Sequence, residues 1–69
     1  MSQSQAILEH LQQGRALDPL TAMRMFGSMR LGARIYDLRR AGHRIVTHSK
    51  RVKGRNGNHA VIAIYRMED

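Results

Sequence analysis

Hydrophobic residues recur at helical spacing in three stretches of the chain and then give way to the alternation that is typical of strands. In the first stretch Ile7, Leu8 and Leu11 repeat among polar residues, which predicts a helix over residues 2–13. The residues that follow, 15–17, are too few for a helix. They are enough for a short extended segment that can pair with a later strand.

The second and third helices are predicted with a tight turn between them. Asp18 is a favoured N-cap and Pro19 suits the first helical position, so a helix is expected over residues 19–26. Gly27 permits an abrupt reversal into a third helix over residues 28–41. Two helices joined in this way form a helix-turn-helix pattern.

The third helix is amphipathic. Leu31, Ile35 and Leu38 fall at i, i+4 and i+7, and this apolar stripe requires a core to cover it. Ser28 is expected to cap the start of the helix, and Gly42 to take the left-handed conformation after its last turn.

A β-hairpin is predicted over residues 44–66, because the β-branched residues after the third helix change from helical to extended spacing. Its tip, residues 53–58, is basic and contains Asn56-Gly57, a pair that is favoured in two-residue type I′ turns. The third helix and this hairpin together carry most of the basic side chains.

The register of the hairpin has two alternatives. A two-residue turn places Ile45 on the same face as Ile62 and Ile64, whereas a three-residue loop places Ile45 with Val61, Ala63 and Tyr65. A slip of one residue exchanges the two faces, so only one of these sets can face the core. We favour the three-residue loop.

The charge of the chain narrows the classes of partner that it is expected to bind. The formal net charge is +7 and the isoelectric point is about 11.4, which predicts a polyanionic partner. The only aromatic residues are Phe26, Tyr36 and Tyr65, too few for a platform on which single-stranded bases stack. Duplex DNA is therefore favoured over single strands.

Several classes of function lack the residues they need. There is no cysteine, and the four histidines include no pair at the spacing of a helical zinc site, so no metal is expected. The five carboxylates are dispersed or terminal, so we expect no catalytic residues, no enzyme activity and no cofactor. No apolar run approaches a membrane span, and the polar N-terminus is unlike a signal peptide, which predicts a cytoplasmic protein with no membrane partner.

The residues that carry a family resemblance run through most of the chain. They are the run from Ile7 to Leu11, Asp18-Pro19-Leu20 with Ala22, Phe26-Gly27, Leu31, Ile35, Leu38-Arg39, Gly42, Ile45 and Thr47. This pattern resembles the small winged helix-turn-helix family of phages and prophages. The resemblance implies an α+β fold of three helices with a short strand between the first two, and it makes the C-terminal hairpin a wing. It also implies a DNA-binding regulatory role.

In such a fold the third helix enters the major groove of duplex DNA, and its exposed residues make the contacts. Arg30 and Arg34 can pair with the O6 and N7 atoms of guanine, and the small Ala33 leaves room for close approach. Ser28 and the amides of the helix start suit a phosphate. Asp37 repels phosphate and is expected to pair with Arg34 or another nearby arginine. The alternative is a solvated basic face that binds no ligand.

The wing is predicted to contact the DNA backbone. Lys50, Arg51, Lys53 and Arg55 make both of its faces cationic, as phosphate contact requires. Arg55 and Asn56, at the tip, suit a minor groove. The alternative for any one of these basic residues is the protection of an edge strand from aggregation.

These observations predict a sequence-specific protein that binds double-stranded DNA, either a phage or prophage transcriptional regulator or an accessory factor of recombination directionality. So small a protein makes one groove contact, so a homodimer or a cooperative assembly on DNA is expected, with the free face of the hairpin as the contact. The alternative is a small phage protein that binds and inhibits a host protein, for example a defence protein. In either role we expect it in the bacterial host cytoplasm or nucleoid.

Overall fold

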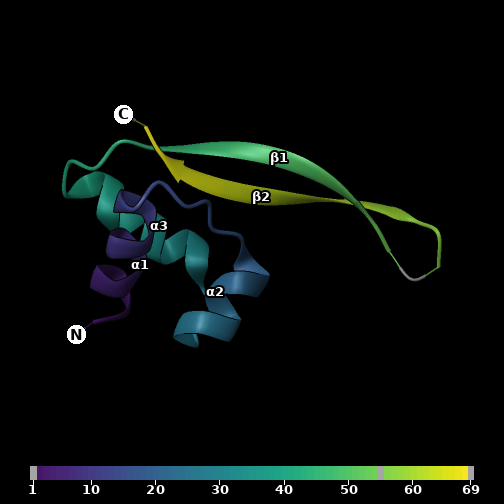
Figure 1. The fold of residues 1–69 in the computed structure, drawn as a ribbon, viewed down its shortest axis with the longest axis horizontal. Coiled ribbons are helices and arrows are strands. Elements are labelled where there is room, and N and C mark those ends of the chain that lie inside the picture. Colours follow the sequence, from purple (N-terminus) through teal and green to yellow (C-terminus); the bar gives the residue numbers. More distant parts are fainter. Residues whose placement is uncertain (1, 55, 69) are drawn as a thin grey trace.

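The computed structural model describes residues 2–54 and 56–68. The elements are α1 (Gln3–Gln12), α2 (Pro19–Phe26), α3 (Leu31–Arg40), β1 (Ile45–Lys53) and β2 (His59–Met67). Figure 1 shows the three helices packed together beside one end of a long antiparallel hairpin, whose other end extends well beyond them. The molecule is therefore elongated, with extents of 39, 24 and 19 Å. The predicted α+β architecture of three helices and a C-terminal hairpin is confirmed.

The first two helices begin as the sequence predicts. The Ser2 hydroxyl accepts a hydrogen bond from the Gln5 amide at 3.2 Å, and Pro19 occupies the first turn of α2. Asp18 caps α2 by accepting from the Thr21 amide at 2.7 Å. These bonds satisfy amides that have no partner inside a helix.

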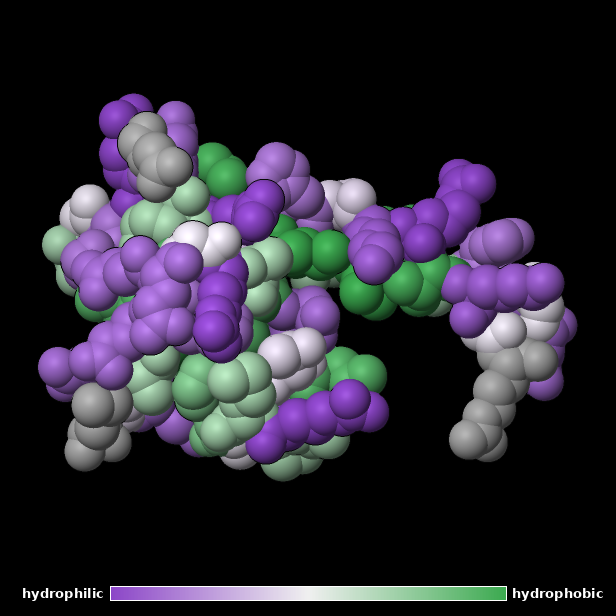
Figure 2. Space-filling view, viewed as in Figure 1, coloured by the Kyte–Doolittle hydropathy of each residue, from purple (hydrophilic) through white to green (hydrophobic). Residues whose placement is uncertain are grey.

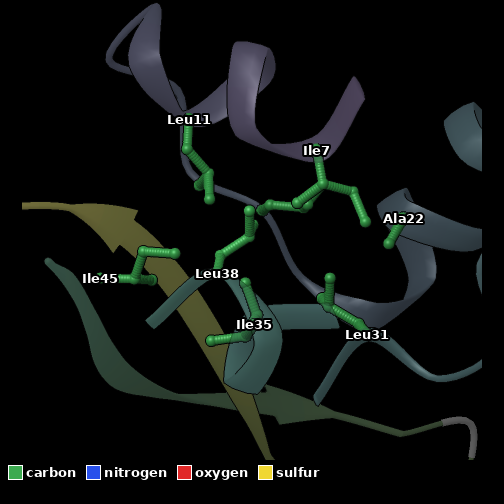
Figure 3. Close-up of a cluster of buried hydrophobic side chains, with 8 residues drawn as sticks. Ile7, Leu11, Ala22, Leu31, Ile35, Leu38 and Ile45 are labelled. Atoms are coloured by element: carbon green, nitrogen blue, oxygen red, sulfur yellow. The ribbon is translucent and has the colours of Figure 1, made fainter. Parts of the chain in front are cut away.

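Eight buried hydrophobic side chains form the core; the three helices and β1 contribute to it, and β2 packs against it. They are Ile7, Leu11, Leu17, Ala22, Leu31, Ile35, Leu38 and Ile45. Figure 3 shows the α1 side chains pointing toward those of α3, with Ile45 of β1 beside Leu38. The predicted apolar stripe of α3 is thus confirmed as the side that holds the helices together.

The hairpin has the register of the three-residue loop. Lys53 lies opposite His59, and the Gly54 amide donates to the Asn58 carbonyl at 2.6 Å. Gly57 is left-handed, with φ 78°, but Asn56 is not, so the pair does not form a two-residue type I′ turn, which needs a positive φ at both positions.

This register turns the hydrophobic residues near the base of the hairpin toward the helices. Ile45 lies opposite Met67 and shares its face with Tyr65, and both Met67 and Tyr65 pack on the core. The other face carries Ile62 and Ile64, which are half-buried. The favoured register is confirmed, and the Ile62 face is the one that the core does not use.

The segment between α1 and α2 adds a third, very short strand. Leu17 pairs with Tyr65 through two backbone hydrogen bonds, from the Leu17 amide at 2.9 Å and from the Tyr65 amide at 2.8 Å. The predicted short strand is therefore a single bridge, and it fastens β2 to the helical body.

Candidate nucleic-acid interface

Helix α3 has distinct sides, each defined by what its residues contact. Leu31, Ile35 and Leu38 are buried in the core. A rotation of about 100° per residue places Arg39 on one flank of this buried side. Its guanidinium lies against the Ile45 carbonyl of β1, so this flank faces the base of the hairpin.

The side of α3 that points away from the core is formed by Ala33, Tyr36, Asp37 and Arg40, by the same rotation. Tyr36 is 59% exposed, and the Arg40 guanidinium lies 5.9 Å from the centre of its ring. Gly32 borders this side, and a Cβ added there would meet no atom of the described residues within 4 Å. Internal packing therefore does not require the glycine, and the first turn of α3 is left open to close approach.

Most of the α3 residues that the sequence indicated lie on or beside this outward side. Arg30 is exposed at the N-cap position, and Ala33 is half-buried. Arg34 Nη2 lies 3.8 Å from Asp37 Oδ2, with 37% and 54% of the two side chains exposed. The predicted pairing of Asp37 with Arg34 is thus confirmed. An exposed pair of this kind contributes less than about 1 kcal/mol, so Arg34 can exchange Asp37 for another anion.

Ser28 does not cap α3, and the predicted helix start at residue 28 is wrong. α3 begins three residues later, and Ser28 is only 3% exposed. The physical reason is Gly27, whose left-handed φ of 67° ends α2 and directs the Ser28 amide to the Ala22 carbonyl at 3.3 Å. Ser28 therefore belongs to the end of α2. A phosphate contact by its hydroxyl does not fit this placement.

Gly32, Tyr36 and Arg40 belong to the outward side but were not singled out from the sequence. They stand four residues apart, the spacing that places side chains one above another on a helix. That spacing is the signal in the sequence that identifies them.

The wing, defined here as residues 45–67, is cationic and has no compensating acid. No aspartate or glutamate stands between Asp37 and Glu68 in the sequence. Lys50, Arg51 and Lys53 are all exposed on β1. The positive potential of this part of the molecule is therefore not offset locally.

The basic side chains of β1 alternate between the two faces of the wing, as successive residues of a strand do. Lys50 lies opposite Ile62, while Arg51 lies opposite Val61 on the other face. Asn56 is exposed at the tip, and Arg55 lies outside the described residues. Both faces thus carry charge, as the sequence predicts.

Two other arginines fix the wing to the helical body. Arg39 donates to the Ile45 carbonyl and to the Thr47 hydroxyl, the latter at 2.8 Å. Arg66 Nη2 donates to the Gly14 carbonyl at 3.2 Å. Their guanidinium groups are engaged by the protein, so they serve the fold.

The shape of the molecule complements this distribution of charge. Figure 2 shows the wing leaving the helical body and an open notch between the body and the far end of the wing. Hydrophilic residues cover much of the body and the far part of the wing, with hydrophobic ones between them. An elongated polyanion can contact the body and the wing together across such a notch.

Other kinds of site find little support in residues 2–54 and 56–68. No group of three or more histidine, cysteine, aspartate or glutamate residues there is arranged to hold a metal ion. Within the same residues, no helix has both the length and the apolar character needed to cross a membrane.

A comparison with protein families supports this geometry. A family model described as a winged helix-turn-helix domain matches residues 2–69, which is nearly the whole chain. Neither the curated proteins nor the solved structures contain a significant match.

Proposed function

The chain belongs to the winged helix-turn-helix domain family, and from this premise we propose that it binds double-stranded DNA with a sequence preference. The observation that carries the proposal is the pairing of two surfaces. One is the outward side of α3, with its open first turn, and the other is a cationic wing that contains no acid.

The outward side of α3 suits the major groove, which admits one α-helix. Arg30, at the start of the helix, and Arg34, on its edge, are the residues we propose to read guanine. Each guanidinium can bond to O6 and N7 together, which discriminates by about 1 to 3 kcal/mol. Arg40 and Tyr36 extend this surface toward the end of the helix.

The wing is proposed to hold the DNA backbone. Lys50, Arg51 and Lys53 are exposed and lie on both faces, so they can reach phosphates on either side of a groove. Asn56 and Arg55 remain our candidates for the minor groove at the tip. Phosphate contacts position a protein on the duplex, whereas the base contacts of α3 supply the sequence preference.

The biological role that we propose is that of a phage or prophage regulator, or of a recombination accessory factor. The support is the resemblance of the residue pattern to the small winged helix-turn-helix family of phages, together with the family match. Such a protein acts by occupying a DNA site or by helping to build a nucleoprotein assembly.

Two or more copies are proposed to act together on DNA. One α3 reads only a few base pairs, and natural sites of this fold type are commonly paired. The unused wing face, which carries Ile62 and Ile64, is the proposed contact between copies. Sedimentation with and without duplex DNA tests this, and a single copy bound at every protein concentration would contradict it.

The experiment that tests DNA binding is a titration of a random 30-base-pair duplex at several salt concentrations. If the protein neutralises Z phosphates, the logarithm of its affinity should fall with the logarithm of salt concentration with a slope of about −0.9Z. Absence of binding at about 50 mM salt would contradict the proposal, because the phosphate contacts supply most of the affinity there.

Selection of bound sequences from a random pool then separates DNA readout from the capture of a host protein. Under DNA readout, Arg30→Ala and Arg34→Ala relax the selected sequence. If the two substitutions leave duplex affinity and sequence preference unchanged but abolish the capture of a host protein, the interaction role is the correct one.

A further inference from the structure

An open apolar groove lies beside the start of α3. It encloses about 320 Å³ and is lined by Pro19, Leu20, Met23, Ser28, Met29 and Leu31. Three of these side chains are unusually exposed for hydrophobic residues: Leu20 by 56%, Met23 by 48% and Met29 by 85%. Neighbouring exposed hydrophobic side chains mark a contact surface more often than isolated ones do.

The charge around the groove indicates what kind of partner fits it. Arg24 follows Met23 and Arg30 follows Met29, and both arginines are exposed. Asp18, the acid nearest in sequence, caps α2 and is bonded to Thr21. The residues next to the lining in sequence thus carry two positive charges against one negative, so a second copy of this chain with a net charge of +7 is a poor occupant and an anionic partner is a good one.

The groove adjoins the start of α3, because Arg30, its N-cap, stands between two residues that line the groove, Met29 and Leu31. Met29 immediately precedes Arg30, and Gly32 and Ala33 follow within the first turn of the helix. The position of the groove beside Arg30, a proposed DNA contact, favours DNA over an acidic protein segment as the occupant.

Thymine is the base whose major-groove edge is partly apolar, because it carries a methyl group on C5. The groove offers apolar side chains and, in Ser28, a single hydroxyl whose oxygen is buried without a hydrogen-bond partner among the described residues. Such a lining suits a methyl group and does not suit a charged one.

We propose that this groove receives the C5 methyl group of a thymine in the bound duplex, with Met29 and Met23 covering the methyl. The proposal rests on the DNA binding proposed above and adds a specificity determinant to it. The arginines of α3 would select guanine, while the groove would select thymine at an adjacent position.

The test uses duplexes enriched by the wild-type protein from a random pool, remade with deoxyuridine in place of one thymine at a time. Deoxyuridine lacks only the methyl group, so the charge and the salt dependence of binding are preserved. At the thymine that occupies the groove we expect binding to weaken by about two- to fourfold, the effect of exposing one buried methyl.

Variants assign the effect to the groove. Met29→Ala should make the thymine and deoxyuridine duplexes bind equally, and its fold is not at risk because the side chain is 85% exposed. Met25→Ala is the matched control, since Met25 is 52% exposed but does not line the groove, and it should keep the preference.

Two results would overturn the inference while leaving DNA binding intact. One is equal binding of the wild-type protein to all the thymine and deoxyuridine duplexes, which would leave a protein segment as the better occupant. The other is a thymine preference that persists in Met29→Ala. Absence of binding to any duplex at low salt would instead overturn the proposed function, and this inference with it.

Discussion

Arg39 holds the carbonyl oxygen of Ile45 with two hydrogen bonds, from Nε at 2.9 Å and from Nη2 at 2.7 Å. The same Nη2 donates to the Thr47 hydroxyl, and the guanidinium lies 6.0 Å from the centre of the Tyr65 ring. One side chain thus joins the last turn of α3 to the first residues of the wing. This contact helps to set the direction in which the wing leaves the body, and therefore the relation between the two DNA-binding surfaces.

Replacing Arg39 with lysine should weaken this connection although the charge is retained. An ammonium group cannot reproduce the planar fork that bonds one carbonyl twice and also lies against a ring. We expect the free energy of unfolding to fall by about 0.5 to 1.5 kcal/mol, the net contribution of a hydrogen bond that the lysine cannot replace. Urea unfolding measures the loss, and amide hydrogen exchange should show faster opening at Val46 and His48, the β1 positions next to Thr47 that bond to β2 in this register.

Arg40→Lys is the matched control because it is the next residue in the same turn. Its guanidinium lies over Tyr36 and has no hydrogen bond within the described residues, so the unfolding free energy should change by less than about 0.5 kcal/mol. Equal effects of the two substitutions would show that the Arg39 contacts do not stabilise the wing.

Ser28→Ala should stabilise the protein or leave its stability unchanged. The serine hydroxyl is buried without a hydrogen-bond partner in the described part of the chain, and such a group costs about 1 to 3 kcal/mol. A serine that capped α3 would give the opposite sign, because loss of a cap costs about 1 kcal/mol. The sign of the shift in the urea midpoint therefore distinguishes the two roles, and a clear loss of stability would contradict the placement of Ser28.

The sequence alone predicts the positions of those elements whose signals are local. Asp18 and Pro19 predict the start of α2 correctly because capping and ring geometry act over one turn. The sequence predicts the start of α3 three residues too early because two local signals compete there. Gly27 ends α2 and draws the Ser28 amide to that helix, which leaves Arg30 at the N-cap of α3 without a side-chain hydrogen bond among the described residues.

The candidate site was less accessible to sequence reasoning than the fold. The cationic character of the wing and the pairing of Arg34 with Asp37 follow from composition and helical spacing. That Arg39 faces β1 depends on how α3 packs on the hairpin, which helical periodicity alone does not determine. The same holds for the groove at Met29, since it requires α2 and the turn to meet in space.

Lys50→Gln and Lys53→Gln should each reduce the salt dependence of DNA binding. Each lysine that releases a counterion contributes about 0.9 to the slope, so the slope should become shallower by about 1 for each substitution. Arg15→Gln removes a charge from the exposed segment between α1 and α2, which adjoins the base of the wing but holds none of the proposed DNA contacts, and should leave the slope unchanged. A similar loss in all three variants would assign the binding to net charge, not to the wing.

Gly32→Ala should separate stability from DNA binding. Glycine within a helix is less stable than alanine by about 0.5 to 1 kcal/mol, and the space around Gly32 is open among the described residues. The substitution should therefore raise the free energy of unfolding by about that amount. The added methyl lies in the first turn of α3, where the duplex is proposed to approach closely, so DNA affinity should fall several-fold while the protein becomes more stable.

Ala33→Gly supplies the reverse control in the same turn. It removes a methyl group, so it should lower stability by about 1 kcal/mol without obstructing the approach of DNA. Thermal unfolding and duplex titration measure the stability and the DNA affinity of both variants. If the proposed contact is correct, Gly32→Ala becomes more stable while its DNA affinity falls. If that variant is stabilised and binds DNA as tightly as the wild type, the first turn of α3 does not lie close to the duplex.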